Sequence, residues 1–211
     1  MIIKKYDIEL IRLTNDKIEL VRKWRNEPKI KKHMFFDGEI TKNMQQKWFT
    51  SIDNISNHYF LIHYKNEAVG LIHLSDLDFE KKDCFSGLFI YEDSFIGTDI
   101  PVRASLCLLD YFFETEWVYT VFAKTKVDNL VALNYNQSLG FEIAGDTENG
   151  KGYLMRLTKE DYEQKTASLK KAIGKEKGEV IFDLTNEVEL AWSKKINHLV
   201  GAATSARQSK I

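Results

Sequence analysis

One histidine and a nearby aspartate in the first half of the chain are suited to proton transfer. His73 lies on a predicted strand, Ala68–Leu74, and Asp76 follows in the loop that leaves it. Imidazole suits general acid–base chemistry because its ordinary pKa lies near neutrality. His73 is therefore a candidate base, although a lone histidine on an amphipathic strand is more often structural. His33 and His63 are weaker candidates, and an ordered water could relay the proton instead.

Basic residues gather just after the first predicted helix, where an anionic ligand could bind. Arg25 and Asn26 precede Pro28, and the basic residues that follow are Lys29, Lys31, Lys32 and His33. Guanidinium and ammonium groups pair well with carboxylates and phosphates. The candidate substrate-binding residues are Arg25, Asn26, His33 and Asp76. A solvated helix end is the alternative explanation of the basic cluster, and the sequence leaves both open.

The composition limits the classes of function. The chain has 211 residues, a length that fits one domain and a further segment, and 44% of them are hydrophobic, enough for a substantial core. Its 30 basic and 31 acidic residues nearly cancel, so nucleic acid and anionic membranes are not expected partners. The N-terminus lacks signal-peptide features, and no apolar stretch is long enough for a membrane span. Cys84 and Cys107 have no metal-binding spacing, so we expect buried thiols, no metal and a cytoplasmic location.

Periodicity and turn residues predict the elements that position these side chains. Helices are expected from about residues 18 and 41, over 102–114 and over 130–139. The expected strands are 8–13, 59–64, 68–74, 85–91, 118–124, 141–144 and 153–157. This order favours an α/β (α+β) fold with a mixed, mostly antiparallel central sheet flanked by helices.

The composition of the sequence changes after Thr158, where charged residues become more frequent. A charged helix is predicted over 159–173, a strand over 179–184 and another helix over 188–200, followed by a flexible tail. We therefore expect a domain over residues 1–158 and a C-terminal helical extension of unknown role over 159–211. The extension could pack back on the domain or supply a surface for a homodimer.

A strand–helix–strand unit follows residue 118. Asn129 stands where the strand gives way to the helix and can accept a hydrogen bond from its free amides. Ala132 keeps one helix face narrow, Gly140 can end the helix in the left-handed conformation, and Phe141 begins the next strand. Any strand–helix–strand fold could contain such a unit. It also resembles the signature of the GNAT acetyltransferase superfamily, which has Asn, a small residue three positions later and a closing Gly-Phe.

This resemblance extends over residues 8–158 and implies an acyltransferase of GNAT fold. Such an enzyme transfers acetyl from acetyl-CoA to a primary amine by direct attack, without a covalent enzyme intermediate. In the superfamily, the strand that contains Leu88 splays away from the strand over 118–124, and its backbone binds the pantetheine arm and thioester. The implied cofactor-binding positions on this strand are Leu88, Phe89, Ile90 and Tyr91. Ordinary core strands without a gap are the alternative.

The segment 91–104 resembles the superfamily's glycine-rich loop, whose amides hold a diphosphate at a helix N-terminus. Only Gly97 matches, because Asp99 and Pro101 occupy the other glycine positions. Asp99 adds a negative charge, and Pro101 has no N–H to donate. The cofactor contacts implied in this loop are Gly97, Thr98, Asp99, Ile100, Val102 and Arg103, with Arg103 compensating for Asp99.

The helix after Asn129 is implied to assist the leaving thiolate, a role the superfamily commonly gives to a tyrosine. Counting from Asn129 places Asn136 at that position, with Tyr135 one residue earlier. Asn136 can donate a hydrogen bond to sulfur but has no acidic proton, and Tyr135 is either an acid or a core residue. The candidate catalytic residues are therefore Asn136, Tyr135 and His73, and Asn129 and Asn136 are also implied to contact the cofactor.

The first half of the chain narrows the resemblance. Arg25-Asn26-Glu27-Pro28, Met34 and His58-Tyr59-Phe60-Leu61 resemble the branch with the ribosomal-protein N-terminal acetyltransferases. They resemble more closely the amino-sugar N-acetyltransferases of the pseudaminic acid pathway. The implied acceptor is a nucleotide-linked amino sugar in surface glycan biosynthesis. Two alternatives remain open: a protein N-terminal amine, or a domain that has lost catalysis and serves in binding or assembly.

Overall fold

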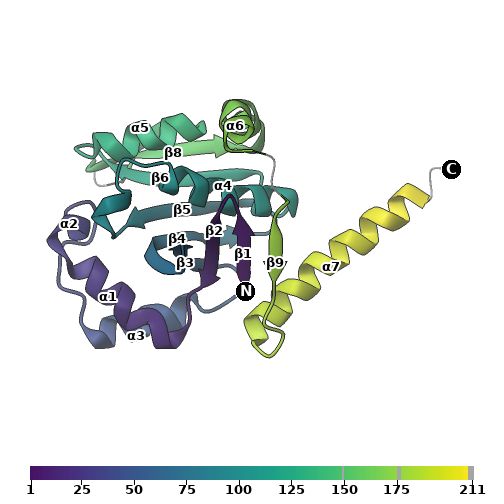
Figure 1. The fold of residues 1–211 in the computed structure, drawn as a ribbon, viewed down its shortest axis with the longest axis horizontal. Helices are drawn as coiled ribbons and strands as arrows, with labels where there is room; N and C mark the ends of the chain where they lie inside the picture. The colour runs from purple at the N-terminus through teal and green to yellow at the C-terminus, as the bar shows by residue number, and fades with distance from the viewer. Residues whose placement is uncertain (149, 175–176, 209–211) are drawn as a thin grey trace.

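A single open sheet organises the computed structural model, which describes residues 1–148, 150–174 and 177–208 (Figure 1). The strand order is β7-β8-β6-β5-β4-β3-β2-β1-β9. The strands are β1 Ile2–Lys5, β2 Ile8–Arg12, β3 His58–Tyr64, β4 Glu67–Asp78, β5 Asp83–Ile90, β6 Thr120–Lys126, β7 Glu142–Asp146, β8 Gly152–Thr158 and β9 Glu179–Ile181. All neighbours pair antiparallel except β5 and β6, which are parallel. The predicted mixed, mostly antiparallel sheet is confirmed.

Helices cover both faces of this sheet (Figure 1). They are α1 Ile18–Asn26, α2 Pro28–Lys31, α3 Lys42–Ile52, α4 Ile100–Glu114, α5 Leu130–Leu139, α6 Lys159–Ile173 and α7 Glu187–Gln208. The larger hydrophobic cluster contains buried side chains of α4, α5, α6 and the start of α7. The smaller cluster joins α1 and α3 to side chains of β3 and β4. The burial of apolar surface on these two faces is the main force that holds the helices on the sheet.

Capping residues fix the start of α3 and both ends of α5. The Thr41 side chain accepts a hydrogen bond from the Met44 amide at the start of α3. The Asn129 Oδ1 atom accepts from the Ala132 amide, 3.1 Å away, at the start of α5. Gly140 ends α5 with φ +104°, a left-handed conformation that costs glycine little. The predicted caps of α5 are therefore confirmed, and its predicted range matches the observed one.

The N-terminal hairpin was not predicted. β1 precedes the expected first strand and pairs with β2 across a turn at Tyr6 and Asp7, where φ is +60° and +59°. Glycine or asparagine usually marks a turn with two positive φ values, and neither is present here. The sequence therefore gives no ordinary signal for this hairpin.

The chain after α1 and the end of β4 both lie near the candidate site. Glu27 is extended and ends α1, and Pro28 begins a short second helix, α2. Asp76 was expected in a loop, but β4 continues to Asp78 through an irregularity in its pairing with β5. Asp76 has φ +55° at that irregularity. Such bulges turn a side chain away from the regular strand direction, and they are common beside active sites.

The C-terminal segment packs back on the rest of the chain, one of the two arrangements expected for it. Trp192 at the start of α7 is buried in the larger cluster, and its Nε1 donates to the Tyr111 hydroxyl at 3.1 Å. Glu189 forms an ion pair with the Met1 ammonium, and β9 extends the sheet beside β1. The second half of α7 projects away from the sheet (Figure 1). The two parts divided at residue 158 thus share one core, and their functional separation stays a prediction.

Candidate active site

The strands β5 and β6 diverge at the centre of the sheet. Their pairing includes only Asp83 with Thr120, Cys84 with Val121 and Phe85 with Phe122. Beyond these residues β5 continues beside β4, and β6 continues beside β8 as far as Lys126. Residues 86–90 and 123–126 therefore face a wedge in which neither strand pairs with the other.

The backbone of β5 supplies hydrogen-bonding groups to this wedge. The Tyr91 amide donates to the Val69 carbonyl at 2.8 Å, so this main-chain group faces β4. Because successive residues of a strand direct their N–H and C=O groups to opposite edges, Leu88 and Ile90 direct theirs to the open edge. The side chains of Phe89 and Tyr91 pack against the smaller hydrophobic cluster. Of the four cofactor positions predicted on this strand, Leu88 and Ile90 thus direct their main-chain groups to the wedge, whereas Phe89 and Tyr91 direct theirs to β4.

His73 lies against the unpaired part of β5. Its register partner on β5 is Gly87, and its register partner on β3 is Tyr59. The imidazole stacks on the Tyr59 ring with a centroid distance of 4.5 Å. A Cβ atom at Gly87 would lie 2.5 Å from His73 Cε1, so the ring occupies the space that a side chain at 87 would need. Glycine in a strand commonly marks such a close approach.

The electrostatic surroundings keep His73 neutral at physiological pH. Burial, and then the neighbouring Arg25, lower the pKa of His73 to about 4. The imidazole therefore has a free lone pair at neutral pH and can accept a proton. A base with so low a pKa takes up a proton only while the proton donor is itself becoming strongly acidic.

Arg25 brings a positive charge to the same face of the sheet. Its guanidinium lies 5.3 Å from the centroid of the Trp48 ring, and Trp48 in turn packs edge-on against Tyr59. Burial lowers the pKa of Arg25, opposed by Tyr59. Among the residues that the structure describes, Arg25 forms no ion pair with a carboxylate. A half-buried cation without a counter-ion favours the binding of an anion.

The other predicted substrate residues differ in how freely they can bind. Asn26 is occupied, because its side chain donates to the Ile40 carbonyl at 2.9 Å and accepts from the Ile40 amide at 2.8 Å. Asp76 is exposed, and its amide is bound by Asn57. Burial, and then Lys32, lower the pKa of His33. Asp76 and Arg25 are thus better placed than Asn26 to contact a ligand.

The two candidates for leaving-group assistance occupy different environments on α5. Asn136 Nδ2 donates to Thr125 Oγ1 of β6 at 3.0 Å. The Tyr135 hydroxyl instead donates to the Pro101 carbonyl at 2.8 Å and lies 2.7 Å from Ser105 Oγ. Burial raises the pKa of Tyr135, which makes it a weaker acid. Asn136 thus faces β6, whereas Tyr135 connects α5 to the first turns of α4.

The loop before α4 offers few free amides to a diphosphate. The Thr98 amide donates to the Phe95 carbonyl, and Thr98 Oγ1 accepts from the Ile100 amide. Gly97 has φ +78°, as its predicted role in a tight loop requires. Arg103 Nε donates to Asp99 Oδ2 at 2.7 Å, and Arg103 also pairs with Asp7 at 3.0 Å. Two carboxylates hold the predicted compensating guanidinium beside the loop.

Several residues of this site were missed from the sequence. Gly87, Tyr59 and Trp48 surround His73 and Arg25, yet none was nominated. Gly87 carried a signal, because a single glycine inside an apolar strand often marks a close contact. Tyr59 and Trp48 read as ordinary apolar-face residues, and only the register of β3 with β4 brings Tyr59 onto His73.

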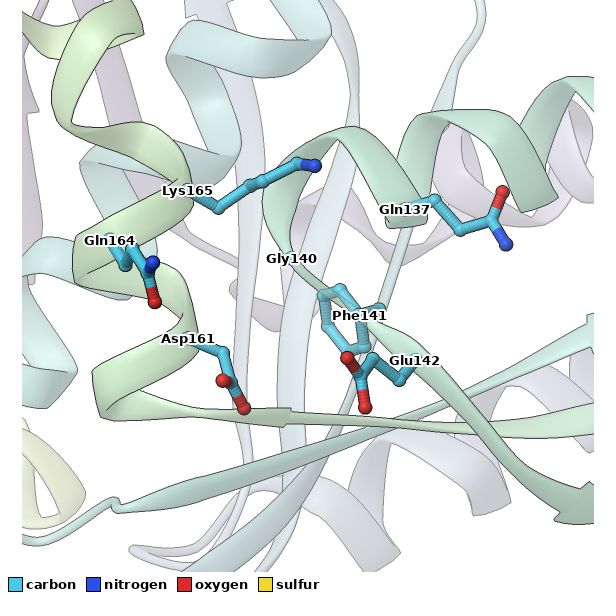
Figure 2. Close-up of a pocket in the computed structure, with 7 residues that line it drawn as sticks. All are labelled: Gln137, Gly140, Phe141, Glu142, Asp161, Gln164 and Lys165. Carbon is cyan, nitrogen blue, oxygen red and sulfur yellow. The ribbon is translucent and has the colours of Figure 1, made fainter.

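A separate depression lies between α5, β7 and α6 (Figure 2). Its lining residues are Gln137, Gly140, Phe141, Glu142, Asp161, Gln164 and Lys165. None of them belongs to β4, β5 or β6, so this depression is distinct from the wedge. In the described residues no group of three or more histidine, cysteine or carboxylate side chains could hold a metal ion. The same part of the chain contains no helix that could span a membrane.

Solved structures resemble this fold over most of its length, at low sequence identity. The aminoglycoside acetyltransferase AAC(6')-Ib in complex with coenzyme A shares 17% identity, with a TM-score of 0.64 over 74% of this chain and 98% of that one. A spermidine N-acetyltransferase from Vibrio cholerae, in complex with CoA and spermine, shares 16% identity, with a TM-score of 0.65 over 75% and 99%. RimL, a ribosomal alpha-N-protein acetyltransferase in complex with coenzyme A, shares 15% identity, with a TM-score of 0.63 over 74% and 95%.

Sequence comparison identifies the family. A search of curated proteins finds no match. The family described as Acetyltransferase (GNAT) domain matches residues 7–142, more than half of the chain, and this range includes both diverging strands and the helix α5. The chain belongs to the GNAT acetyltransferase family.

Proposed function

We propose that the chain transfers acetyl from acetyl-CoA to the primary amine of a small molecule. The observation that supports this most strongly is the wedge between β5 and β6, with the His73 ring lying on its Gly87 side. A wedge of this kind gives a thioester access to the main-chain groups of Leu88 and Ile90. Family membership supports the reaction class, and the solved neighbours in complex with coenzyme A support the donor.

The donor would bind from the α4 side of the sheet. The diphosphate would lie at the first turn of α4, near Gly97, Thr98, Asp99, Ile100, Val102 and Arg103. There Arg103 would turn from Asp99 and Asp7 toward phosphate, because a dianionic ligand competes with two exposed carboxylates. The amides of Leu88 and Ile90 would bind the pantetheine arm and the thioester carbonyl, where an N–H can stabilise the developing oxyanion. Asn129 at the start of α5, and Asn136, which contacts Thr125 of β6, would contact the cofactor from the other side.

The reaction needs a neutral amine, a proton acceptor and a stabilised thiolate. The amine nitrogen attacks the thioester carbonyl carbon, a C–N bond forms and the C–S bond breaks. As the nitrogen gains positive charge, its proton passes to the neutral His73 ring, directly or through a water. Asn136 donates a hydrogen bond to the departing sulfur, and the thiolate, a comparatively stable anion, takes its proton from solvent. Tyr135 would position α4 rather than act as the acid.

The acceptor that we favour is a nucleotide-linked amino sugar, of the kind used in surface glycan biosynthesis. Arg25 supports this choice, because its guanidinium has no carboxylate partner in the described residues and a nucleotide diphosphate would supply an anionic partner. Asp76, exposed at the bulge of β4, could orient the amine or a sugar hydroxyl. We also propose a cytoplasmic location, where the buried thiols of Cys84 and Cys107 would stay reduced.

A protein N-terminal amine is the second candidate acceptor, favoured by the similarity in fold to RimL. A binding module without catalysis is the third, and Asp99, Pro101 and Asn136 are the departures from the superfamily pattern that favour it. These candidates predict different results when free thiol release from acetyl-CoA is followed with separate acceptors. The acceptors are a UDP-linked 4-amino sugar, a set of peptides with free N-termini, and spermidine.

We expect thiol release with the amino sugar at least tenfold faster than with the other acceptors. Turnover confined to peptides would replace the proposed acceptor by a protein. The absence of turnover with every amine, together with the absence of acetyl-CoA binding, would contradict the enzyme itself.

A further inference from the structure

We call the segment over residues 28–37 the strap. It consists of α2 and the first part of the loop that leads to α3. Its first anchor lies at the end of β5. Lys29 Nζ donates to the Tyr91 carbonyl at 2.6 Å and to Asp93 Oδ1 at 2.9 Å. The same ammonium lies 4.3 Å from the centroid of the Tyr91 ring. In Figure 1, α2 lies beside the end of β5.

The second anchor of the strap lies across the wedge, at the end of β6. Lys126 Nζ donates to the Lys32 carbonyl at 2.9 Å. Lys126 is the last residue of β6, and its register partner is Gly152 at the start of β8. The strap thus contacts both the end of β5 and the end of β6, on the side of the wedge away from the paired residues 83–85 and 120–122.

Phe35 fixes the strap on β8 by direct packing. A Cβ atom built on Gly152 would lie 2.6 Å from the Thr125 carbonyl oxygen of β6, 2.7 Å from Phe35 Cζ and 3.0 Å from Phe35 Cε1. The aromatic ring therefore covers the glycine, which is buried at the start of β8. Only a residue without a side chain leaves room for both the Phe35 ring and the backbone of β6 at this position.

The position of these contacts determines what the strap can do. The wedge is closed at the Phe85–Phe122 end by strand pairing and is open at the end where β5 reaches Ile90 and β6 reaches Lys126. The strap leaves α1 on the face that carries His73 and Arg25 and crosses this open end. An extended polypeptide lying across the site would have to pass where the strap contacts β8.

We propose that the strap is a specificity element that closes one end of the acceptor site, with Phe35 as the specificity-determining residue and Gly152 as its seat. It admits compact amines from the side of α1 and α3 and excludes extended polypeptides. This inference rests on the proposed function, since it concerns which amine reaches the acetyl group.

The test compares the full-length wild type with Phe35→Ala, which removes the ring. The readout is the ratio of kcat/KM for a peptide with a free N-terminus to kcat/KM for a UDP-linked amino sugar. This variant is expected to raise the ratio at least tenfold. Phe36→Ala is the matched control, because Phe36 is similarly exposed but its ring packs on Gly38 within the loop that follows α2. That control should leave the ratio unchanged.

Hydrogen exchange gives a second readout that does not depend on turnover. Amides over residues 28–37 should exchange at least tenfold faster in Phe35→Ala than in the wild type. An active wild type whose ratio and exchange are the same in all variants would contradict the strap but leave the proposed function standing. A wild type that acetylates peptides as well as amino sugars would also contradict it. A wild type without activity on any amine would contradict the proposed function first, and the inference with it.

Discussion

Two charged clusters on opposite faces of the sheet differ in how completely their charges are neutralised. On the α4 face, buried Asp110 receives Lys5 Nζ at 2.6 Å, Lys170 Nζ at 2.5 Å and the Tyr6 and Tyr162 hydroxyls at 2.7 Å each. On the α1 face, the Arg25 guanidinium lies over the Trp48 ring and pairs with no carboxylate in the described residues. Burial alone would raise the pKa of Asp110, but the bonds from Lys170 and Lys5 outweigh burial and lower it.

This difference separates a structural cluster from a ligand-binding one. Asp110 has its counter-charges within the chain and connects α4, α6 and the N-terminal hairpin. A charge left without a partner near a neutral histidine costs folding free energy that a bound anion can recover. We therefore propose a structural role for the first cluster and a catalytic role for the second, and each of the following changes tests one of these roles.

The largest expected effect is on catalysis at His73. His73→Gln should lower kcat by about 10²- to 10³-fold, because glutamine cannot accept the proton that the amine loses. The measurement is steady-state thiol release with the preferred acceptor. His63→Gln is the matched control on the neighbouring strand β3 and should keep kcat near the wild-type value. A His73→Gln enzyme with kcat within twofold of wild type would show that solvent takes the proton.

The next effect is on stability at Asp110. Asp110→Asn keeps the shape of the side chain but leaves two ammonium groups facing an amide, so it should cost about 3 kcal/mol of unfolding free energy. Urea denaturation measures this loss. The kcat/KM of the variant should change far less than that of His73→Gln. A loss of stability below about 1 kcal/mol would mean that the cluster is solvated and weak.

At Arg25, in contrast to Asp110, we expect a change in substrate binding without a loss of stability. Arg25→Met keeps much of the contact with Trp48 but removes the charge, so KM for an anionic acceptor should rise about 10- to 30-fold. Stability in urea should stay the same or rise, because an unpaired half-buried cation is removed. Lys23→Met on the exposed side of α1 is the control. Equal KM values for anionic and uncharged acceptors in wild type and variant would remove the case for an anionic substrate.

The pH dependence of stability tests the burial of two neutral histidines, one on each face of the sheet. Burial lowers the pKa of His58 to about 3 and that of His73 to about 4, whereas unfolded histidine titrates near 6.5. Between the folded and unfolded pKa values, the unfolded chain binds more protons than the folded chain. The free energy of unfolding is therefore highest above about pH 6.5 and decreases as the pH falls. Each histidine should cost about 2 kcal/mol at pH 5.

Urea denaturation at pH 7.5 and pH 5 measures this difference. His58→Phe is the diagnostic variant, because the His58 ring already packs against Phe112 and Trp192. It should remove about half of the pH dependence. The same unfolding free energy at both pH values in the wild type would contradict the burial of neutral histidines.

Local sequence signals predicted much of the fold. The limits of α5 and its caps at Asn129 and Gly140 were predicted, because capping depends on residues adjacent in sequence. The hairpin of β1 with β2 was missed, because Tyr6 and Asp7 turn the chain without a glycine. The mixed, mostly antiparallel character of the sheet followed from the order of elements along the chain and from the family resemblance.

The candidate site depended on contacts that no local signal contains. His73 and Arg25 were nominated by residue type, but Gly87 and Tyr59 reach His73 only through the registers of β5 and β3 with β4. That Arg25 has no carboxylate beside it among the described residues is likewise a property of the folded chain. The Phe35–Gly152 contact joins residues more than a hundred positions apart, and only the position of the strap across the wedge explains it.

The most direct test of the central claim is whether acetyl-CoA binds in the wedge. Urea denaturation with and without millimolar acetyl-CoA, followed by structure determination of the complex, measures this. We predict a stabilisation of about 2.7 kcal/mol at a concentration 100 times the dissociation constant, and a thioester held between β5 and β6 beside Leu88 and Ile90. No stabilisation at millimolar acetyl-CoA, or a cofactor bound elsewhere on the surface, would contradict the account.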